Sequence, residues 1–377
     1  MGMASAAPAS AQESDDAEEP AVRNLRGRGA IAVYVDDQDT TIVSPFGGAG
    51  VTVEEVEIDA AWTADVITSA SVDVVTAATP QISELRHELS LSASRESVLL
   101  DVDLAGGLIY STENDADSLI VQLGAKRGIA QDNFELGLNY ALSYNTVGTS
   151  IEPHAERDTL WVQNGDLAFV WIMGPRTVVE AAYSTSFARG FQENPYRRVF
   201  VTWREDLVGA NWVGENVPDV RWRNALTGRV QHAFSRELAG GLDYRFYVDT
   251  WGVLGHTATA TLTYEPMEGF EVRFRQRASL QGGADFYAEK YEQETRYRTR
   301  DRRLSPHISG STGLAVAWET GPVGPLGLLT LRLGVDALAF RYGDYLVPTP
   351  DPFGAAGFET LGWTTALVTH FGLEIRQ

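Results

Sequence analysis

The charged side chains of this sequence recur at every second position of several segments, and this spacing indicates what chemistry they can do. Residues two apart on a β-strand point to the same face, so each segment presents a row of like charges. The acidic rows contain Glu57, Asp59, Asp65, Glu88, Asp101, Asp103, Glu135 and Glu180. The basic rows contain Arg221, Arg223, Arg229, Arg245, Arg273, Arg275 and Arg277. Neighbouring like charges repel when water is excluded, so these rows predict surfaces that contact water and polar solutes.

The residue types that usually carry catalysis show no comparable pattern. The chain has six His and no Cys, which excludes thiol nucleophiles and zinc bound by Cys. The HExxH, GxSxG and SxxK motifs and a Gly-rich phosphate cradle do not occur. His256 could act as a general base with the nearby Asp249 as its partner. A His that is only hydrogen bonded at a strand end is the stronger interpretation. We therefore expect no catalytic residue and no enzyme activity.

Two acidic turns, residues 36–39 and 113–117, carry hard oxygen ligands of the kind that calcium prefers. Neither turn has the glycine and the distal glutamate of a calcium loop, and turns rich in Asp and Asn are ordinary. We therefore predict no metal site and no cofactor.

The overall charge narrows the range of partners. The chain has 51 acidic and 30 basic residues, a net charge of -21. This balance argues against nucleic acid as a partner, because phosphate binding needs clustered Lys and Arg. Apolar residues make up 44% of the chain, which is too much for a disordered protein.

The elements that position the charged rows are long strands with one apolar face. In residues 134–144 every even position is large and apolar, and every odd position is polar or small. The same alternation recurs in residues 56–66, 98–104, 270–275 and 361–375. Several of these segments exceed the roughly five or six residues of an average soluble strand and reach the nine to eleven that cross a bilayer. Aromatic residues at their ends (Phe134, Tyr144, Trp171, Phe187, Phe234, Tyr264, Phe270 and Trp318) suit two interfacial girdles.

The connections alternate in length along the chain. Short turns are expected at residues 53–55, 94–97, 128–133, 174–176, 235–240, 267–269 and 320–326. Longer polar connections are expected at residues 68–83, 111–117, 146–158, 190–220, 281–306 and 344–357. The pattern predicts an all-β, transmembrane, antiparallel up-and-down β-barrel of about 16 strands (range about 14 to 16), with short periplasmic turns and long extracellular loops. Its first pair would be residues 30–36 and 40–53, its last pair 326–342 and 358–377, with 198–205 in a loop.

Residues 1–28 are expected to precede the barrel, which would occupy residues 29–377 as a single domain. The small residues Ala9, Ser10 and Ala11 are typical of a signal-peptide cleavage site, and the acidic residues that follow indicate a solvated leader.

Several phrases in a fixed order resemble one bacterial family. They are WTADVITSASVDVVTAATP (62–80), RHE (86–88), GFQENPYR (190–197), PDVR (218–221), YRFYVDTWGVLGHT (244–257), ADFY (284–287), DR (301–302) and LS (304–305). Together they resemble the domain of unknown function 3570 family, over about residue 30 to the C-terminus. The resemblance implies an integral β-barrel of the Gram-negative outer membrane, and it brings no activity and no catalytic residues. Such barrels usually end on an aromatic residue that the barrel-assembly machinery reads, whereas this chain ends on Gln377.

The favoured function is a water-filled, porin-like channel for small polar solutes, whose lumen has an acidic wall opposite a basic wall. The alternatives are a plugged structural barrel that partners a periplasmic or surface complex, an outer-membrane hydrolase, and a soluble protein of two packed sheets. The expected partners are outer-membrane lipid, lipopolysaccharide, the assembly machinery and small polar solutes. Residues 281–306, in which Tyr and Arg interleave, could contact the anionic sugar layer, fold inward as a constriction or form a solvated loop.

Overall fold

Sixteen antiparallel strands close into one barrel, which confirms the predicted fold class and strand number. The computed structural model describes residues 22–69, 82–99, 101–148, 156–202, 212–324, 327–343, 345–349 and 357–377. In order around the barrel, the strands are β1 (Val22–Asp36), β2 (Thr40–Val53), β3 (Val56–Ser69), β4 (Ile82–Leu99), β5 (Val102–Thr112), β6 (Ala116–Ile129), β7 (Phe134–Val147), β8 (Asp158–Gly174), β9 (Thr177–Gly190), β12 (Val220–Ala233), β13 (Leu238–Asp249), β14 (Leu254–Met267), β15 (Phe270–Gln281), β17 (His307–Pro322), β18 (Leu328–Tyr342) and β21 (Trp363–Arg376). The barrel closes where β21 pairs with β1, from Arg26 opposite Arg376 to Asp36 opposite Ala366.

The period-two alternation of the sequence becomes the two faces of this barrel. Large apolar side chains occupy one set of alternate positions and are exposed, as Leu123 (61%) and Leu242 (62%) illustrate. An apolar band of this kind is the surface that meets lipid, and the closed ladder leaves no unpaired edge in the bilayer. Most of the aromatic residues expected at the strand ends are exposed on the same outer face, among them Trp171, Phe234 and Trp318. No helix in the described part of the chain is long and apolar enough to cross a membrane.

The other set of alternate positions forms the inner face. Residues directly opposite each other on antiparallel strands share a face. Following the paired residues from strand to strand therefore identifies the positions of the inner face all around the barrel. One such belt runs through Asp59, Ser92, Gly107, Gln122, Ala141, Asn164, Ser186, Arg223 and Asp249. A second stretch begins four residues earlier in β13 and runs through Arg245, Thr257, Ser279, Ser309, Phe340 and Thr364. Small and polar residues therefore line the interior.

Several boundaries differ from those expected. β1 begins at Val22, so residues 22–28 belong to the barrel and the predicted leader was too long; residues 1–21 lie outside the described residues. The turn expected at 94–97 is wrong, because β4 continues to Leu99 and the chain turns at Asp101, which has a positive φ of 56°. The long connection expected at 111–117 is also wrong, since only Glu113–Asp115 separate β5 from β6. Most of the connection expected at 68–83 lies outside the described residues.

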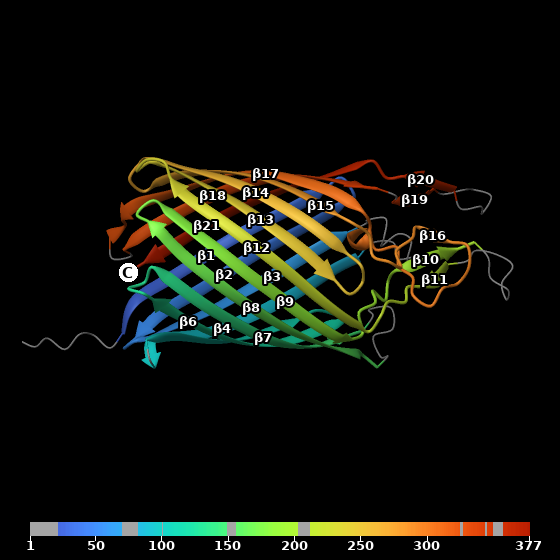
Figure 1. The fold of residues 1–377 in the computed structure, drawn as a ribbon, viewed down its shortest axis with the longest axis horizontal. Coiled ribbons are helices and arrows are strands. Elements are labelled where there is room, and N and C mark those ends of the chain that lie inside the picture. The colour runs from blue at the N-terminus through green and yellow to red at the C-terminus, as the bar shows by residue number, and fades with distance from the viewer. Residues whose placement is uncertain are drawn as a thin grey trace, which may run out of the picture.

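The longest connections fold into structure beyond one end of the barrel (Figure 1). The segment between β9 and β12 contains β10 (Arg198–Val201) and β11 (Trp212–Gly214), and the segment between β15 and β17 contains β16 (Lys290–Tyr291) and the 3-10 helix η1 (Arg302–Leu304). β10 pairs antiparallel with β11 and parallel with β16. We call the described residues of 191–219 and 282–306 the cap. β19 (Leu346–Thr349) and β20 (Gly357–Thr360) form a separate hairpin at the same end. The C-terminus lies at the opposite end.

Candidate functional site

The inner face gathers almost all of the charged residues singled out from the sequence. The acidic residues Glu57, Asp59 and Asp65 are inner positions of β3, Glu88 of β4, Asp103 of β5, Glu135 of β7 and Glu180 of β9. The basic residues Arg221, Arg223 and Arg229 are inner positions of β12, Arg245 of β13, and Arg273, Arg275 and Arg277 of β15. Asp101 is the exception, because it lies in the β4–β5 turn rather than in a strand. We call the inner side of β3–β9 the acidic wall and that of β12–β15 the basic wall.

Carboxylates of the acidic wall are paired with cations that were missed from the sequence. Arg26 of β1 forms ion pairs with Glu57 and Asp59, and Arg28 donates to the other oxygen of Asp59 at 2.7 Å. Lys126 of β6 lies 3.5 Å from Glu135 and 3.8 Å from Asp103. Arg26 and Arg28 were missed because the predicted barrel began at residue 29. Lys126 was missed although it stands at an inner position of an alternating strand, and that parity would have found it.

Several arginines of the basic wall form ion pairs with carboxylates of their own strand or of nearby strands. Arg229 bridges two strands, with Nη1 2.7 Å from Glu180 and Nε 3.0 Å from Asp243. Arg221 donates twice to Asp249, which is buried. Two further pairs are Arg273 with Glu271 at 2.8 Å and Arg275 with Asp336 at 2.7 Å. The repulsion within each row is thus relieved by carboxylates on the same strand or one or two strands away, and pairing across the lumen is not required.

Water has access to these inner charges. Half or more of the side-chain surface of Lys126, Arg273 and Arg275 is exposed (53%, 53% and 50%). Hollows lie against both walls. One of about 320 Å³ is lined on the acidic wall by small and neutral inner residues, among them Ser92, Gly107, Gln122 and Ala141. Another of about 440 Å³ lies on the basic wall over Asp243, Thr259, Thr261, Arg273 and Arg275. A barrel of sixteen to eighteen strands is wide enough to leave such space.

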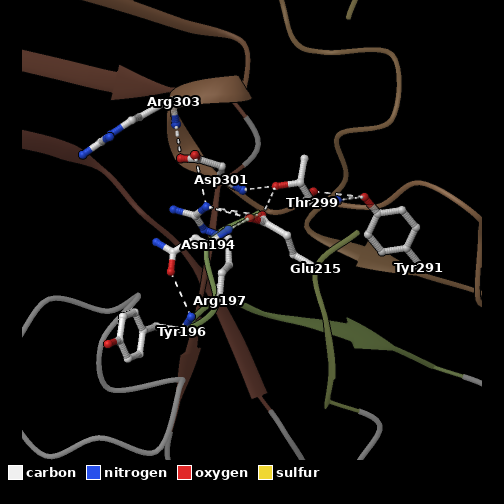
Figure 2. Close-up of polar contacts among 8 residues, drawn as sticks. All are labelled: Asn194, Tyr196, Arg197, Glu215, Tyr291, Thr299, Asp301 and Arg303. Atoms are coloured by element: carbon white, nitrogen blue, oxygen red, sulfur yellow. Dashed lines mark hydrogen bonds and ion pairs between the residues drawn. The ribbon is translucent and has the colours of Figure 1, made fainter. Parts of the chain in front are cut away.

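At the barrel end that carries the long connections, the buried carboxylate of Glu215 holds the cap together (Figure 2). Its two oxygens accept hydrogen bonds from the backbone N–H of Asn194 at 2.6 Å, from the Thr299 hydroxyl at 2.6 Å and from Arg197 at 3.3 and 3.2 Å. Arg197 also lies 3.1 Å from Asp301. The Glu215 side chain is only 2% exposed. Because Thr299 and Asp301 come from the β15–β17 connection, this cluster joins the two halves of the cap.

Two apolar clusters complete the cap. Val199 and Val201 are fully buried and pack with Val213 and Tyr291. The Tyr291 hydroxyl accepts a hydrogen bond from the Thr299 N–H at 2.8 Å, and burial raises the pKa of Tyr291 to about 12. The second cluster contains Val217, Trp251, Val253, Ala284 and Leu304, and Tyr247, an inner residue of β13, packs against it. The solvated loop considered for residues 281–306 is therefore wrong, since these residues fold against the inner rim.

The cap contacts two widely separated points of the barrel rim. On one side, the Tyr196 hydroxyl donates to Asp115 in the β5–β6 turn. On another, the buried Arg300 donates to the Leu346 carbonyl at 2.8 Å, and its guanidinium lies 5.5 Å from the ring centre of Tyr345. The β5–β6 turn and the β18–β21 connection, which contains Leu346, are separated by six strands in one direction around the barrel and by ten in the other. The cap therefore contacts two widely separated points of the rim.

The candidate general base does not assemble with its partner. His256 is on the outer face, where Nδ1 lies 2.7 Å from the Tyr244 hydroxyl, whereas Asp249 accepts from Arg221 and Tyr247 on the inner face. Among the described residues, no group of three or more His, Asp or Glu side chains could hold a metal ion. In the second acidic turn, burial and the neighbouring Asp115 raise the pKa of Glu113.

A closed sixteen-stranded barrel with an apolar outer band, short turns at one end and long connections at the other is an integral outer-membrane β-barrel. Within that class, residues 162–323 match the model of a family described as "Protein of unknown function (DUF3570)". The match confirms the resemblance noted from the sequence and contains six of its phrases in full, although it is shorter than the span expected. No curated protein matches the chain.

One of three solved structures compared with the chain reaches a TM-score above 0.5 and shares its fold. The match to a "Bacterial polysaccharide outer membrane secretin" covers 95% of this chain and 99% of that one, at 9% identity and a TM-score of 0.51. The match to CdiB from Acinetobacter baumannii covers 92% of this chain and 60% of that one, at 9% identity and a TM-score of 0.48. The match to the outer membrane protein opdK from Pseudomonas aeruginosa covers 94% of this chain and 98% of that one, at 10% identity and a TM-score of 0.44. Identities this low describe shared architecture alone.

Proposed function

We propose that this barrel is a porin-like conduit for small polar solutes, with a hydrated lumen between an acidic and a basic wall and a cap that restricts its extracellular mouth. The observation that carries the proposal is the exposure of the inner charges: Lys126, Arg273 and Arg275 keep about half of their surface in contact with water. A barrel filled by its own side chains would bury these groups, and burial of so many charges would cost several kcal/mol each. A transverse field between walls of opposite sign orders water and sorts polar solutes.

In this role the protein is a conduit and not an enzyme. In its support, His256 faces lipid and is bonded to Tyr244, and the buried carboxylates Asp249 and Glu215 are engaged by arginines. The lipid bilayer, lipopolysaccharide and the barrel-assembly machinery are the partners proposed for the outer surface and for insertion.

Planar-bilayer recordings of the purified full chain test the conduit. We expect discrete conductance steps, because water and ions share the lumen. Conductance no greater than that of the protein-free bilayer would refute the proposal.

The cap favours a second candidate, a barrel that is closed at rest and serves as the outer-membrane partner of a periplasmic or surface complex. Its contacts at two widely separated points of the rim, through Tyr196 and Arg300, support this alternative. The two candidates differ in the same recordings. A silent wild-type chain that conducts after Glu215→Gln loosens the cap would support the closed barrel, whereas conduction by the wild-type chain favours the conduit.

A further inference from the structure

Two arginines of the basic wall differ from their neighbours in how their charge is balanced. Arg221, Arg229, Arg273 and Arg275 form ion pairs with carboxylates, and Arg223 hydrogen bonds to Tyr247. Within the part of the chain that the structure describes, neither Arg245 nor Arg277 has a carboxylate within the 4.0 Å of an ion pair. Both side chains are exposed in the lumen.

The register places these two arginines on either side of one strand, β14. Arg245 of β13 is opposite Thr257, and Arg277 of β15 is opposite Thr259, the next inner residue of β14. With strands about 4.8 Å apart and a rise of about 3.4 Å per residue, their Cβ atoms lie about 12 Å apart. Guanidinium groups on flexible stems can therefore approach one small ligand from both sides. Thr257 and Ser279, whose hydroxyls are 3.0 Å apart, add hydroxyl groups to the same surface.

The surface also has room for a ligand. The 440 Å³ hollow of the basic wall begins at Thr259 and extends over Thr261 and Thr263. Asp243, the carboxylate that lines it, is already paired with Arg229 at 3.0 Å. The guanidinium groups in the lining of the hollow are those of the paired Arg273 and Arg275. The hollow adjoins Arg277 through Thr259, the residue opposite it on β14, and so leaves space beside the unpaired guanidinium groups.

We propose that Arg245 and Arg277, with the hydroxyl groups of Thr257 and Thr259, form a binding site for small polyanions that carry two or more carboxylate or phosphate groups. The inference rests on the proposed conduit function, because the solute must reach the lumen, and it adds the class of solute that the basic wall retains. A guanidinium binds a carboxylate or a phosphate through two parallel hydrogen bonds, and two guanidiniums on opposite sides favour a ligand with two charged ends. The acidic wall faces the remainder of the lumen, so we expect local retention of anions rather than a uniformly anionic pore.

The test measures binding to the detergent-solubilised full chain by calorimetry at low ionic strength, with citrate and pyrophosphate as separate probes. The variant is Arg245→Gln with Arg277→Gln. The control is Arg332→Gln, an inner arginine of β18 that is paired with Glu374 at 2.7 Å. Heat-modifiable migration on gels verifies that each variant is a folded barrel. We expect the double variant to bind about 100-fold more weakly, about tenfold for each guanidinium lost, and the control to stay within about threefold of wild type. Binding of citrate alone or pyrophosphate alone identifies carboxylate or phosphate as the preferred group.

Current recordings separate this inference from the function on which it rests. If the wild-type chain conducts and either probe blocks the current less in the double variant than in Arg332→Gln, the site lies on the solute path. If the chain conducts but the probes bind equally to all three proteins, or do not bind at all, the polyanion site is overturned and the conduit stands. If the chain does not conduct but binding is lost in the double variant alone, the conduit fails and the site stands.

Discussion

Neutralising Glu215 is predicted to loosen the cap without disturbing the barrel. Glu215→Gln keeps the shape of the side chain but removes the charge that accepts hydrogen bonds from Asn194, Thr299 and Arg197. A hydrogen bond to a charged group contributes about 1 kcal/mol more than a neutral one, so three donor groups give a loss of about 3 kcal/mol. Removing one partner of a buried ion pair costs about 3–5 kcal/mol when the other charge is left unpaired. The expected loss lies at the lower end of this range, because Arg197 keeps Asp301 as a partner at 3.1 Å.

At about 1.4 kcal/mol per factor of ten, this loss corresponds to a cap that opens about 100 times more often. Hydrogen exchange measured by mass spectrometry reports such local opening, and peptides that contain Val199, Val201 and Thr299 should exchange faster in the variant. Peptides from the barrel strands should exchange as in wild type.

Glu294→Gln is the matched control, because Glu294 pairs with Arg298 at 3.3 Å in the same cap but is 43% exposed. An exposed pair of this kind contributes about 0.2–1 kcal/mol, so cap exchange should rise at most about fivefold. Equal exchange rates in Glu215→Gln and Glu294→Gln would refute the idea that the buried cluster holds the cap together.

Three further predictions follow from the two faces and the cap. Leu123→Arg on the outer face should lower the free energy of unfolding in lipid vesicles, measured by urea titration, by about 2–4 kcal/mol, whereas Gln122→Arg on the inner face should cost under about 1 kcal/mol; equal costs would contradict a hydrated lumen. Trp251→Ala should destabilise the cap by about 3–5 kcal/mol, because Trp251 is buried between Arg221 and Phe286, and should speed hydrogen exchange of cap peptides but not of β3–β9. Burial raises the pKa of Glu193, so the neutral carboxyl stabilises the cap, and this stabilisation is lost as the pH rises through the raised pKa. Glu193→Gln should therefore show the same cap exchange as wild type near pH 4 and slower cap exchange than wild type at pH 7. Slower exchange in the variant at low pH alone would contradict this pH dependence.

The alternation of residues such as Phe134, Leu136 and Leu138 was enough to predict long strands, their number and a lipid-facing side. Side-chain direction in a strand depends on the parity of the position alone, so a local pattern defines both faces. The same parity predicted which arginines and carboxylates share the inner face. It failed at Asp101, where the chain turns with a positive φ, because an apolar–polar alternation continues through a short turn without a visible break.

The tertiary structure decided what the pattern leaves open. Ion pairs such as Arg229 with Glu180 and Asp243 depend on which strands are neighbours and on their register, and Glu180 and Arg229 are far apart in the sequence. The cap was beyond sequence reasoning for the same reason, since Glu215 joins Arg197 to Thr299 across two connections that carry no periodic signal. The balance of charge at Arg245 and Arg277 is likewise a property of the closed barrel, because only the positions of all neighbouring strands determine which guanidinium has a carboxylate within reach.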